Sequence, residues 1–407
     1  MSAGALLTIG LGASGTSQPD ASGRWLGPVR SVRSPAGQHS AQPHLHTSAH
    51  GAVLSWVERD GATATLRFAE PREGGWSPPR SVAFGENWFV NWADVPSVVR
   101  LDNGTLAAHW LQKSGTGAYA YDVRLSHSRD GGRTWAPSFT PHHDGTQTEH
   151  GFASLFQVAG GGLGLVWLDG RQMGSGTGHD GSHGSSAGSM TLRFGAYDAG
   201  WRQVADEPVD LRVCDCCPTT AAIASEGPIV AFRNRTDDEV RDIHVSRLEH
   251  GRWTEPVAVH DDTWRIAACP VNGPMLSARG RDVVVAWFTA ATGDGRAYVA
   301  FSSDAGRTFG RPLRIDAVAS LGRVDVELLP DGAAVATWIE LENPGASFMV
   351  RRITATGERS PAVRVATLDG SRTSGYPRAA LQGSELLFAW TDASASTVRT
   401  AVATLLQ

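Results

Sequence analysis

The sequence predicts an all-β protein, a β-propeller of four-stranded blades. Three observations predict it: a hairpin pattern that recurs along the chain, a composition rich in turn-forming residues, and an N-terminal strand without inner partners. The chain has 407 residues with 47 Gly, 21 Pro and 14 Trp, and only 19% of its residues are charged. Such a length usually means two or three domains. A propeller accommodates a chain of this length in a single domain, because the fold grows by adding blades around a channel.

The recurring pattern is an apolar run that ends in an aromatic residue. A short stretch and a turn containing Gly precede each run, which is typical of a β-hairpin. The runs are spaced 51 to 65 residues apart, at Val53–Trp56, Leu106–Trp110, Leu165–Trp167, Ile229–Phe232, Val284–Trp287, Val335–Trp338 and Leu387–Trp390. Each hairpin supplies the two inner strands of a blade. We therefore predict seven blades, with six as the alternative.

A second marker, an aromatic residue often followed by Pro and Val, comes after each early hairpin. It occurs at Trp76, Trp135, Trp201, Trp253 and Phe309. The seventh repeat lacks the marker, whereas Trp25–Val29 carries it with no inner strands before it. We therefore expect the N-terminal strand to complete the last blade, which removes free sheet edges. One propeller domain is predicted over residues 23–407.

Residues 1–22 form either a disordered tail or the remnant of a secretory signal, because the apolar stretch Ala3–Ala13 lacks a positive region before it. We expect an extracytoplasmic protein, periplasmic or secreted. The net charge is -5 and both signs are scattered, which argues against nucleic acid as a partner. No apolar run reaches about 18 residues, so no membrane span is predicted. No motif indicates a nucleotide or organic cofactor, and a monomer is expected.

Two outer hairpins carry the same turn motif. Ser128–Trp135 fits the pattern S-x-D-x-G-x-T-W, and Ser302–Phe309 fits it with Phe in place of Trp. The Asp carboxylate of such a turn accepts backbone N–H bonds, and Gly supplies a permissive φ. The two motifs, in register with the repeats, resemble the Asp-box (BNR-repeat) propellers of the sialidase-like superfamily.

That resemblance implies a glycoside hydrolase site with three arginines, a Tyr nucleophile backed by Glu, and an Asp acid/base. Tyr376 resembles the nucleophile and Asp94 the acid, while Arg233 or Arg235 resembles the second arginine and Arg323 the third. The first-blade motif of the superfamily, Arg-Ile-Pro, is absent, and residues 42–45 read Gln-Pro-His-Leu instead.

Propeller topology predicts which loops meet. Because strands alternate in direction, the links into the innermost strands and the links after the second strands open on one face. Such a concave, polar rim is the expected binding site. On it Glu149 is a further catalytic candidate and Arg171 a further substrate-binding candidate. A small molecule or glycan is the expected partner there.

All four cysteines fall in two adjacent links on this face: Cys214, Cys216 and Cys217 in one, Cys269 in the next. A disulfide from Cys269 to one of the other three is one interpretation. A metal site is another, with His143 and His150 as further ligands; sulfur and imidazole favour copper first and zinc second. A reactive thiol pair is the third.

Three functions follow as hypotheses. The first is a propeller with a Cys/His metal site, in metal binding or redox chemistry. The second is a sialidase-type, exo-acting glycosidase on an acidic sugar. The third is a non-catalytic propeller that binds a glycan or a protein.

Overall fold

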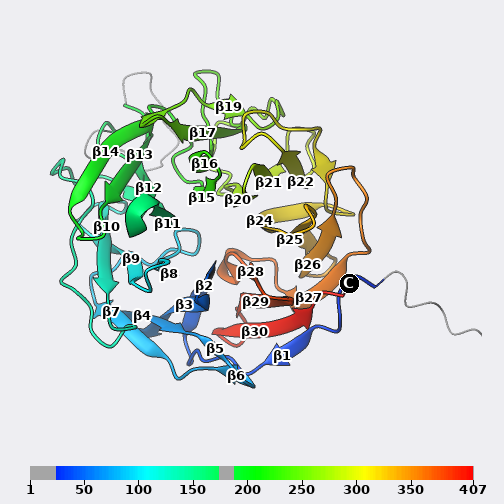
Figure 1. Ribbon diagram of the computed structural model, residues 1–407, viewed down its shortest axis with the longest axis horizontal. Coiled ribbons are helices and arrows are strands. Elements are labelled where there is room, and N and C mark those ends of the chain that lie inside the picture. The colour runs from blue at the N-terminus through cyan, green and yellow to red at the C-terminus, as the bar shows by residue number, and fades with distance from the viewer. Residues whose placement is uncertain (1–23, 174–187, 407) are drawn as a thin grey trace, which may run out of the picture.

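The computed structural model describes residues 24–173 and 188–406 and shows one seven-bladed β-propeller (Figure 1). The tail predicted over residues 1–22 lies outside the described residues. Seven sheets stand around a central axis, with the first strand of each hairpin innermost. The predicted all-β class and the count of seven blades are therefore confirmed.

The blades follow one another in chain order, and neighbouring strands within each blade are antiparallel. The first three blades are formed by β2 (Ser40–Ser48), β3 (Gly51–Asp60), β4 (Thr63–Ala69) and β7 (Arg80–Gly85); by β8 (Ser97–Arg100), β9 (Leu106–Lys113) and β10 (Tyr121–Ser128); and by β11 (His150–Val158), β12 (Gly162–Asp169), β13 (Thr191–Tyr197) and β14 (Gln203–Asp210). The next two are formed by β15 (Thr220–Ala224), β16 (Gly227–Arg233), β17 (Ile243–Glu249), β18 (Arg252–Trp253) and β19 (Val257–Ala258); and by β20 (Met275–Arg279), β21 (Asp282–Thr289), β22 (Arg296–Ser302) and β23 (Leu313–Arg314). The last two are formed by β24 (Ser320–Leu328), β25 (Ala334–Leu341), β26 (Ala346–Ile353) and β27 (Val363–Leu368); and by β28 (Arg378–Gln382), β29 (Glu385–Asp392), β30 (Thr397–Thr404) and β1 (Arg30–Val32). Outside the blades lie the hairpin of β5 (Pro71–Arg72) and β6 (Gly75–Trp76) and two short 3-10 helices, η1 (Ala159–Gly161) and η2 (Arg372–Ser374).

The N-terminal strand closes the ring. Strand β1 pairs with β30, with Ser31 opposite Ala401, and places the first and last strands of the propeller in one sheet (Figure 1). The Gly27 N–H donates to the Thr404 carbonyl at 2.8 Å, and Leu26 is buried in the core of the last two blades. The predicted closure is thus confirmed, and β1 covers the outer edge of β30.

The aromatic residues that mark the repeats form the core. Trp56, Trp167, Trp287 and Trp338 end the apolar runs of four second strands, and all four side chains are 0% exposed. Trp167 packs in one cluster with residues of the preceding blade, so the rings fill the space between neighbouring sheets. Removal of one such ring in a core typically costs about 3–5 kcal/mol.

Both Asp boxes form the expected turn. Asp130 Oδ1 accepts the N–H groups of Arg133 and Thr134 at 2.9 and 3.0 Å, and Asp304 makes the matching pair of bonds. The first box follows the end of β10, whose start at Tyr121 pairs with the end of β9. The boxes therefore lie on the face opposite the links into the inner strands.

Candidate functional site

The link between β14 and β15 brings three cysteines together at the mouth of the propeller. Cys214, Cys216 and Cys217 are buried, with 1%, 6% and 2% of their surface exposed. The link is fixed near its start, because the Cys214 N–H donates to the Arg233 carbonyl at 2.9 Å. It is fixed at its end by β15, which begins at Thr220. We call these three residues the cysteine cluster.

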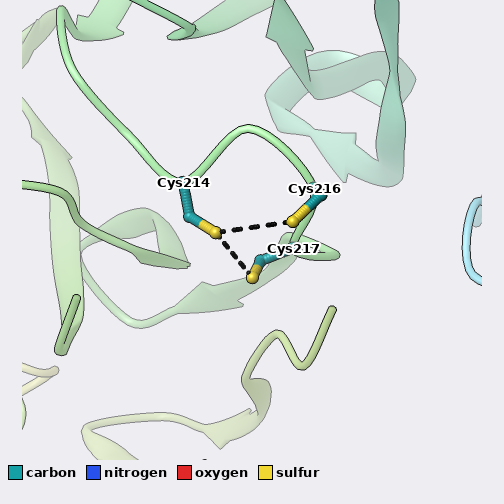
Figure 2. A group of neighbouring side chains, drawn as sticks. All are labelled: Cys214, Cys216 and Cys217. Carbon is teal, nitrogen blue, oxygen red and sulfur yellow. Dashed lines mark hydrogen bonds between the residues drawn. The ribbon is translucent and has the colours of Figure 1, made fainter. Parts of the chain in front are cut away.

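The sulfur atoms of the cysteine cluster converge. Cys214 Sγ lies 3.9 Å from Cys216 Sγ and 2.8 Å from Cys217 Sγ, and all three sulfurs lie within 4.8 Å of one another. Figure 2 shows the three side chains pointing toward one another from a single loop. Neither distance is that of a disulfide bond, which would require about 2.05 Å. Cys269, half-buried in the next link, hydrogen-bonds to the thiol of Cys216.

A buried guanidinium sets the charge at the cluster. Arg241 Nη1 lies 3.6 Å from Cys214 Sγ. Burial alone would raise the pKa of the Cys214 thiol, but hydrogen bonds from Cys216 and Cys217 and the charge of Arg241 hold it well below its usual value. The hydrogen bond to Cys214 raises the pKa of Cys216, and burial raises that of Cys217. The charge of Arg241 therefore favours the thiolate form of Cys214 over that of Cys216 and Cys217.

An ion network clamps the cysteine-bearing link to the fourth blade. Asp215, 0% exposed, accepts two bonds from Arg235 Nη1 at 3.0 and 3.1 Å. Glu239 accepts from Arg235 and also from Arg241, the latter at 2.7 Å. Loss of one partner in such a buried pair typically costs about 3–5 kcal/mol. The clamp thus fixes both the loop and the guanidinium beside Cys214.

The two cysteine-bearing links approach so closely that a glycine is required. A Cβ atom on Gly273 would lie 1.8 Å from the backbone oxygen of Pro218. Pro218 directly follows Cys217, and Gly273 lies four residues after Cys269. The absence of a side chain at Gly273 is therefore what lets the two loops pack together.

Tyr376, the predicted nucleophile, packs beside the cysteine cluster. It belongs to the same buried cluster as the three cysteines, and its ring stacks on Trp92 with centroids 5.8 Å apart. Its hydroxyl donates to the Val271 carbonyl at 2.5 Å, and burial raises its pKa far above the usual value. Both effects oppose ionisation of the phenol.

Asp94 and Glu149, the predicted catalytic carboxylates, meet through Tyr121. The Tyr121 hydroxyl lies 3.0 Å from Asp94 Oδ2 and 2.8 Å from Glu149 Oε1, and Asp94 Oδ1 accepts the Phe152 N–H at 2.8 Å. Burial raises the pKa of Asp94 to about 7. Sequence reasoning missed Tyr121, although the start of a third strand also lies on the mouth face.

A small cavity opens beside these carboxylates. Its volume is about 160 Å³, and its walls include Asp94, Phe152, Thr219, Met275 and Arg378. These residues come from or beside the innermost strands. One wall is therefore the start of β15, directly after the cysteine cluster.

The predicted substrate-binding arginines are engaged in protein contacts. Arg233 donates to the backbone carbonyls of Asn272, Arg241 and Phe288 at 2.6 to 2.9 Å and is 1% exposed. These three bonds and the burial hold the Arg233 guanidinium inside the protein. Arg235 serves in the clamp described above.

The other two arginines are also paired. Arg171 makes two bonds to the Asp169 carboxylate, at 2.8 and 2.7 Å. Arg323 donates to the Ser371 carbonyl at 2.8 Å and lies 4.8 Å above the ring of Trp92. Each of the four predicted arginines therefore has a structural partner.

The predicted histidine ligands lie apart from the sulfurs. His143 is exposed. His150 stacks on His142 and is flanked by Asp122 and Asp144. Burial alone would lower the pKa of His150, but these two carboxylates raise it to about 9, whereas burial and the charge of His150 lower that of His142 to about 4.

The seven blades, the N-terminal closure and the two Asp boxes define the fold as that of a sialidase-like β-propeller. No protein-family model matches the chain, and no curated protein matches it in sequence. Among solved structures it is similar to a protein of unknown function from Dyadobacter fermentans, with 15% identity over 94% of this chain and 99% of the other and a TM-score of 0.54.

It is also similar to the polysaccharide lyase Uly1, with 12% identity, 96% and 94% coverage and a TM-score of 0.53. The NanB sialidase from Streptococcus pneumoniae has 8% identity, 93% and 94% coverage and a TM-score of 0.48. At these identities the similarity shows the fold alone. In the part of the chain that the structure describes, no helix is long and apolar enough to cross a membrane.

Proposed function

We propose that this protein binds one thiophilic metal ion, Cu(I) in the first place and Zn(II) in the second, at the cysteine cluster. Cys214, Cys216 and Cys217 are the ligands, and Cys269 is the fourth sulfur within reach. The observation that carries the proposal is the convergence of three buried sulfurs within 4.8 Å of one another. Thiolate ligands select Cu(I) and zinc over hard cations.

Distances support the proposal. Metal–sulfur bonds of about 2.3 Å at tetrahedral or trigonal angles place two sulfurs about 3.8 to 4.0 Å apart. Cys214 and Cys216 already have that spacing, at 3.9 Å. Cys217 has to move away from Cys214 by about 1 Å, which a rotation of its side chain supplies.

The coordination number separates the two metals. Cu(I) is satisfied by three thiolates, whereas a structural zinc site takes four ligands. Cys269 hydrogen-bonds to Cys216, so it is placed to complete a four-sulfur site. All of the proposed ligands at the cysteine cluster are sulfur atoms. His150 is not among them, because the residues that surround it are Asp122, His142, Asp144 and Asp169.

The test is elemental analysis of the protein purified under reducing conditions from cells supplied with copper and zinc, beside a count of free thiols after denaturation. The proposal predicts one copper or zinc per chain at the cysteine cluster, lost in Cys214→Ser, and four titratable thiols once the metal is removed. No metal, no uptake on reconstitution and fewer than three free thiols would mean a disulfide instead.

Two variants sharpen the result. Cys214→Ser removes the central sulfur and abolishes binding of either metal at the cysteine cluster. Cys269→Ser is the matched control, because it removes a sulfur outside the cluster. This variant should still bind Cu(I) and should bind zinc more weakly.

An extracytoplasmic location stays a prediction. The glycosidase hypothesis stays a prediction. The contacts of Tyr376 and of the arginines give it no support, and a panel of sialosides and uronides tests it. Binding of a glycan or protein at the mouth also stays a prediction.

A further inference from the structure

A second group of possible ligand atoms lies at the junction of the second and third blades. Asp122 Oδ1 lies 3.4 Å from His150 Nδ1 and 3.7 Å from His142 Nε2, and the three atoms lie within 4.8 Å of one another. Each of these atoms is buried, and none makes a hydrogen bond of proper geometry to any described residue. His150 is 0% exposed and His142 5%. We call these three residues the histidine cluster.

Unsatisfied atoms of this kind need an explanation, because a buried polar group without a partner typically costs about 1–3 kcal/mol. Here three of them face one another. A proton on His150 can be shared with Asp122 and Asp144, but His142 Nε2 still faces the Asp122 carboxylate at 3.7 Å. A cation at the meeting point would satisfy all three together.

The hydrogen bond on the far side of His142 fixes the role of its ring. His142 Nδ1 donates to Asp144 Oδ2 at 3.1 Å. The neutral ring then directs the lone pair of Nε2 toward the Asp122 carboxylate, and a lone pair facing an anion is repulsive unless a cation lies between them. Metal-ligating histidines commonly donate their other N–H to a carboxylate in this way.

Regular structure positions all three residues. Asp122 is the second residue of β10 and His150 the first of β11, and the backbone of Tyr121 bridges to that of Glu149. His142 comes from the loop between these strands, and its ring stacks on that of His150 with centroids 3.8 Å apart. The ligand atoms are therefore held by two paired strand starts rather than by a free loop.

We propose that the histidine cluster is a second metal site, which binds a divalent ion, Zn²⁺, through one carboxylate and two imidazoles. It shares no residue with the cysteine cluster and is independent of the function proposed above. Imidazole and carboxylate ligands suit zinc, and three protein ligands leave the fourth position for water or substrate. The rings stand 8° from parallel, so binding requires them to tilt toward the ion.

The experiment uses a protein without thiols, so that its result does not depend on the cysteine cluster. The four cysteines are replaced by Ser, folding is checked by circular dichroism, and Zn²⁺ is titrated calorimetrically. Asp122→Asn and His150→Gln are made in this background. His127→Gln is the matched control, because His127 also has a buried unpartnered Nδ1 but stacks on Trp201 instead of facing a carboxylate.

The proposal predicts one Zn²⁺ per chain, with affinity reduced at least about tenfold by Asp122→Asn and by His150→Gln and unchanged by His127→Gln. Absence of Zn²⁺ uptake by the folded thiol-free protein, or uptake that survives His150→Gln, would overturn it and would assign a proton to His150 instead. If the thiol-free chain does not fold, the Zn²⁺ stoichiometry of the reduced wild type is compared with that of His150→Gln in excess Zn²⁺, so that the cysteine cluster contributes equally to both. One ion fewer in His150→Gln supports the site, and an equal stoichiometry refutes it.

Discussion

The buried Asp94–Tyr121–Glu149 group predicts a specific dependence of stability on pH. Tyr121 has one hydroxyl proton but lies within hydrogen-bonding distance of both carboxylates, 3.0 Å from Asp94 and 2.8 Å from Glu149. The arrangement is satisfied if Asp94 carries a proton and donates it to the Tyr121 oxygen while Tyr121 donates to Glu149. Burial raises the pKa of Asp94 to about 7, which agrees with a protonated carboxyl near neutral pH.

Asp94→Asn tests this arrangement, because the amide reproduces it. The Asn oxygen can accept the Phe152 N–H as Asp94 Oδ1 does, and the Asn nitrogen can donate to Tyr121. In the wild type the folded state holds a proton that the unfolded state, with a pKa near 3.9, has already lost. The stability contributed by Asp94 therefore falls as pH rises from about 4 to about 7, and Asp94→Asn abolishes that fall.

Linkage gives the size of the effect. A folded pKa of about 7 against an unfolded pKa of about 3.9 makes the wild type lose about 3 kcal/mol between pH 5 and pH 8 from this group alone. For a chain of this size that corresponds to about 4 °C in Tm. The difference in Tm between Asp94→Asn and wild type should therefore increase by about that amount from pH 5 to pH 8.

The assay is thermal unfolding of both proteins at four pH values, with Asp60→Asn as control because Asp60 is exposed at the end of β3. The titrations of all other groups cancel in the difference between variant and wild type. A difference that stays constant with pH, or that decreases as pH rises, would refute the assignment of the proton to Asp94.

Three further predictions concern closure and the cysteine cluster. Gly273→Ala should lower the free energy of unfolding by about 3 kcal/mol and expose the cysteines, because its Cβ would lie 1.8 Å from the Pro218 oxygen. Tm reports the loss of stability and the rate of thiol alkylation reports the exposure, and an unchanged Tm would contradict the prediction. Leu26→Ala should lower the free energy of unfolding, measured with urea, by about 3 kcal/mol, because it loosens the closure of the ring. A loss below about 1 kcal/mol would mean that the N-terminal segment contributes little to the closure. Arg241→Gln should raise the pKa of Cys214, because it removes a guanidinium 3.6 Å from the sulfur. The pKa is measured in metal-free protein from the ultraviolet absorbance of the thiolate as a function of pH. An unshifted titration would contradict the role of Arg241.

The fold could be predicted from sequence because each blade repeats the same physical requirement. Every second strand needs an apolar run that ends in a ring large enough to fill the gap to the next blade, as Trp167 does. The closure could be predicted because Trp25–Val29 has no partner of its own earlier in the chain. Because the hairpin pattern recurs along the chain, it predicts the fold more strongly than any single hairpin does.

The site could be predicted only in part. Propeller topology placed the cysteines on one face, but the sequence analysis considered only the links into the inner strands and the links after the second strands. Tyr121 and Asp122 were missed because they begin a third strand, which opens on the same face. The backbone partners of Arg233 could not be foreseen, since they depend on where the carbonyls of neighbouring blades point.

X-ray absorption spectroscopy at the metal edge tests the central claim most directly. The protein is loaded with one equivalent of Cu(I) under reducing conditions, and the ligands around the metal are identified. We predict a shell of three sulfurs at about 2.3 Å in the wild type, lost in Cys214→Ser and retained in Cys269→Ser. A shell of nitrogen or oxygen, or no bound copper in a protein with reduced thiols, would contradict the assignment of a metal to Cys214, Cys216 and Cys217.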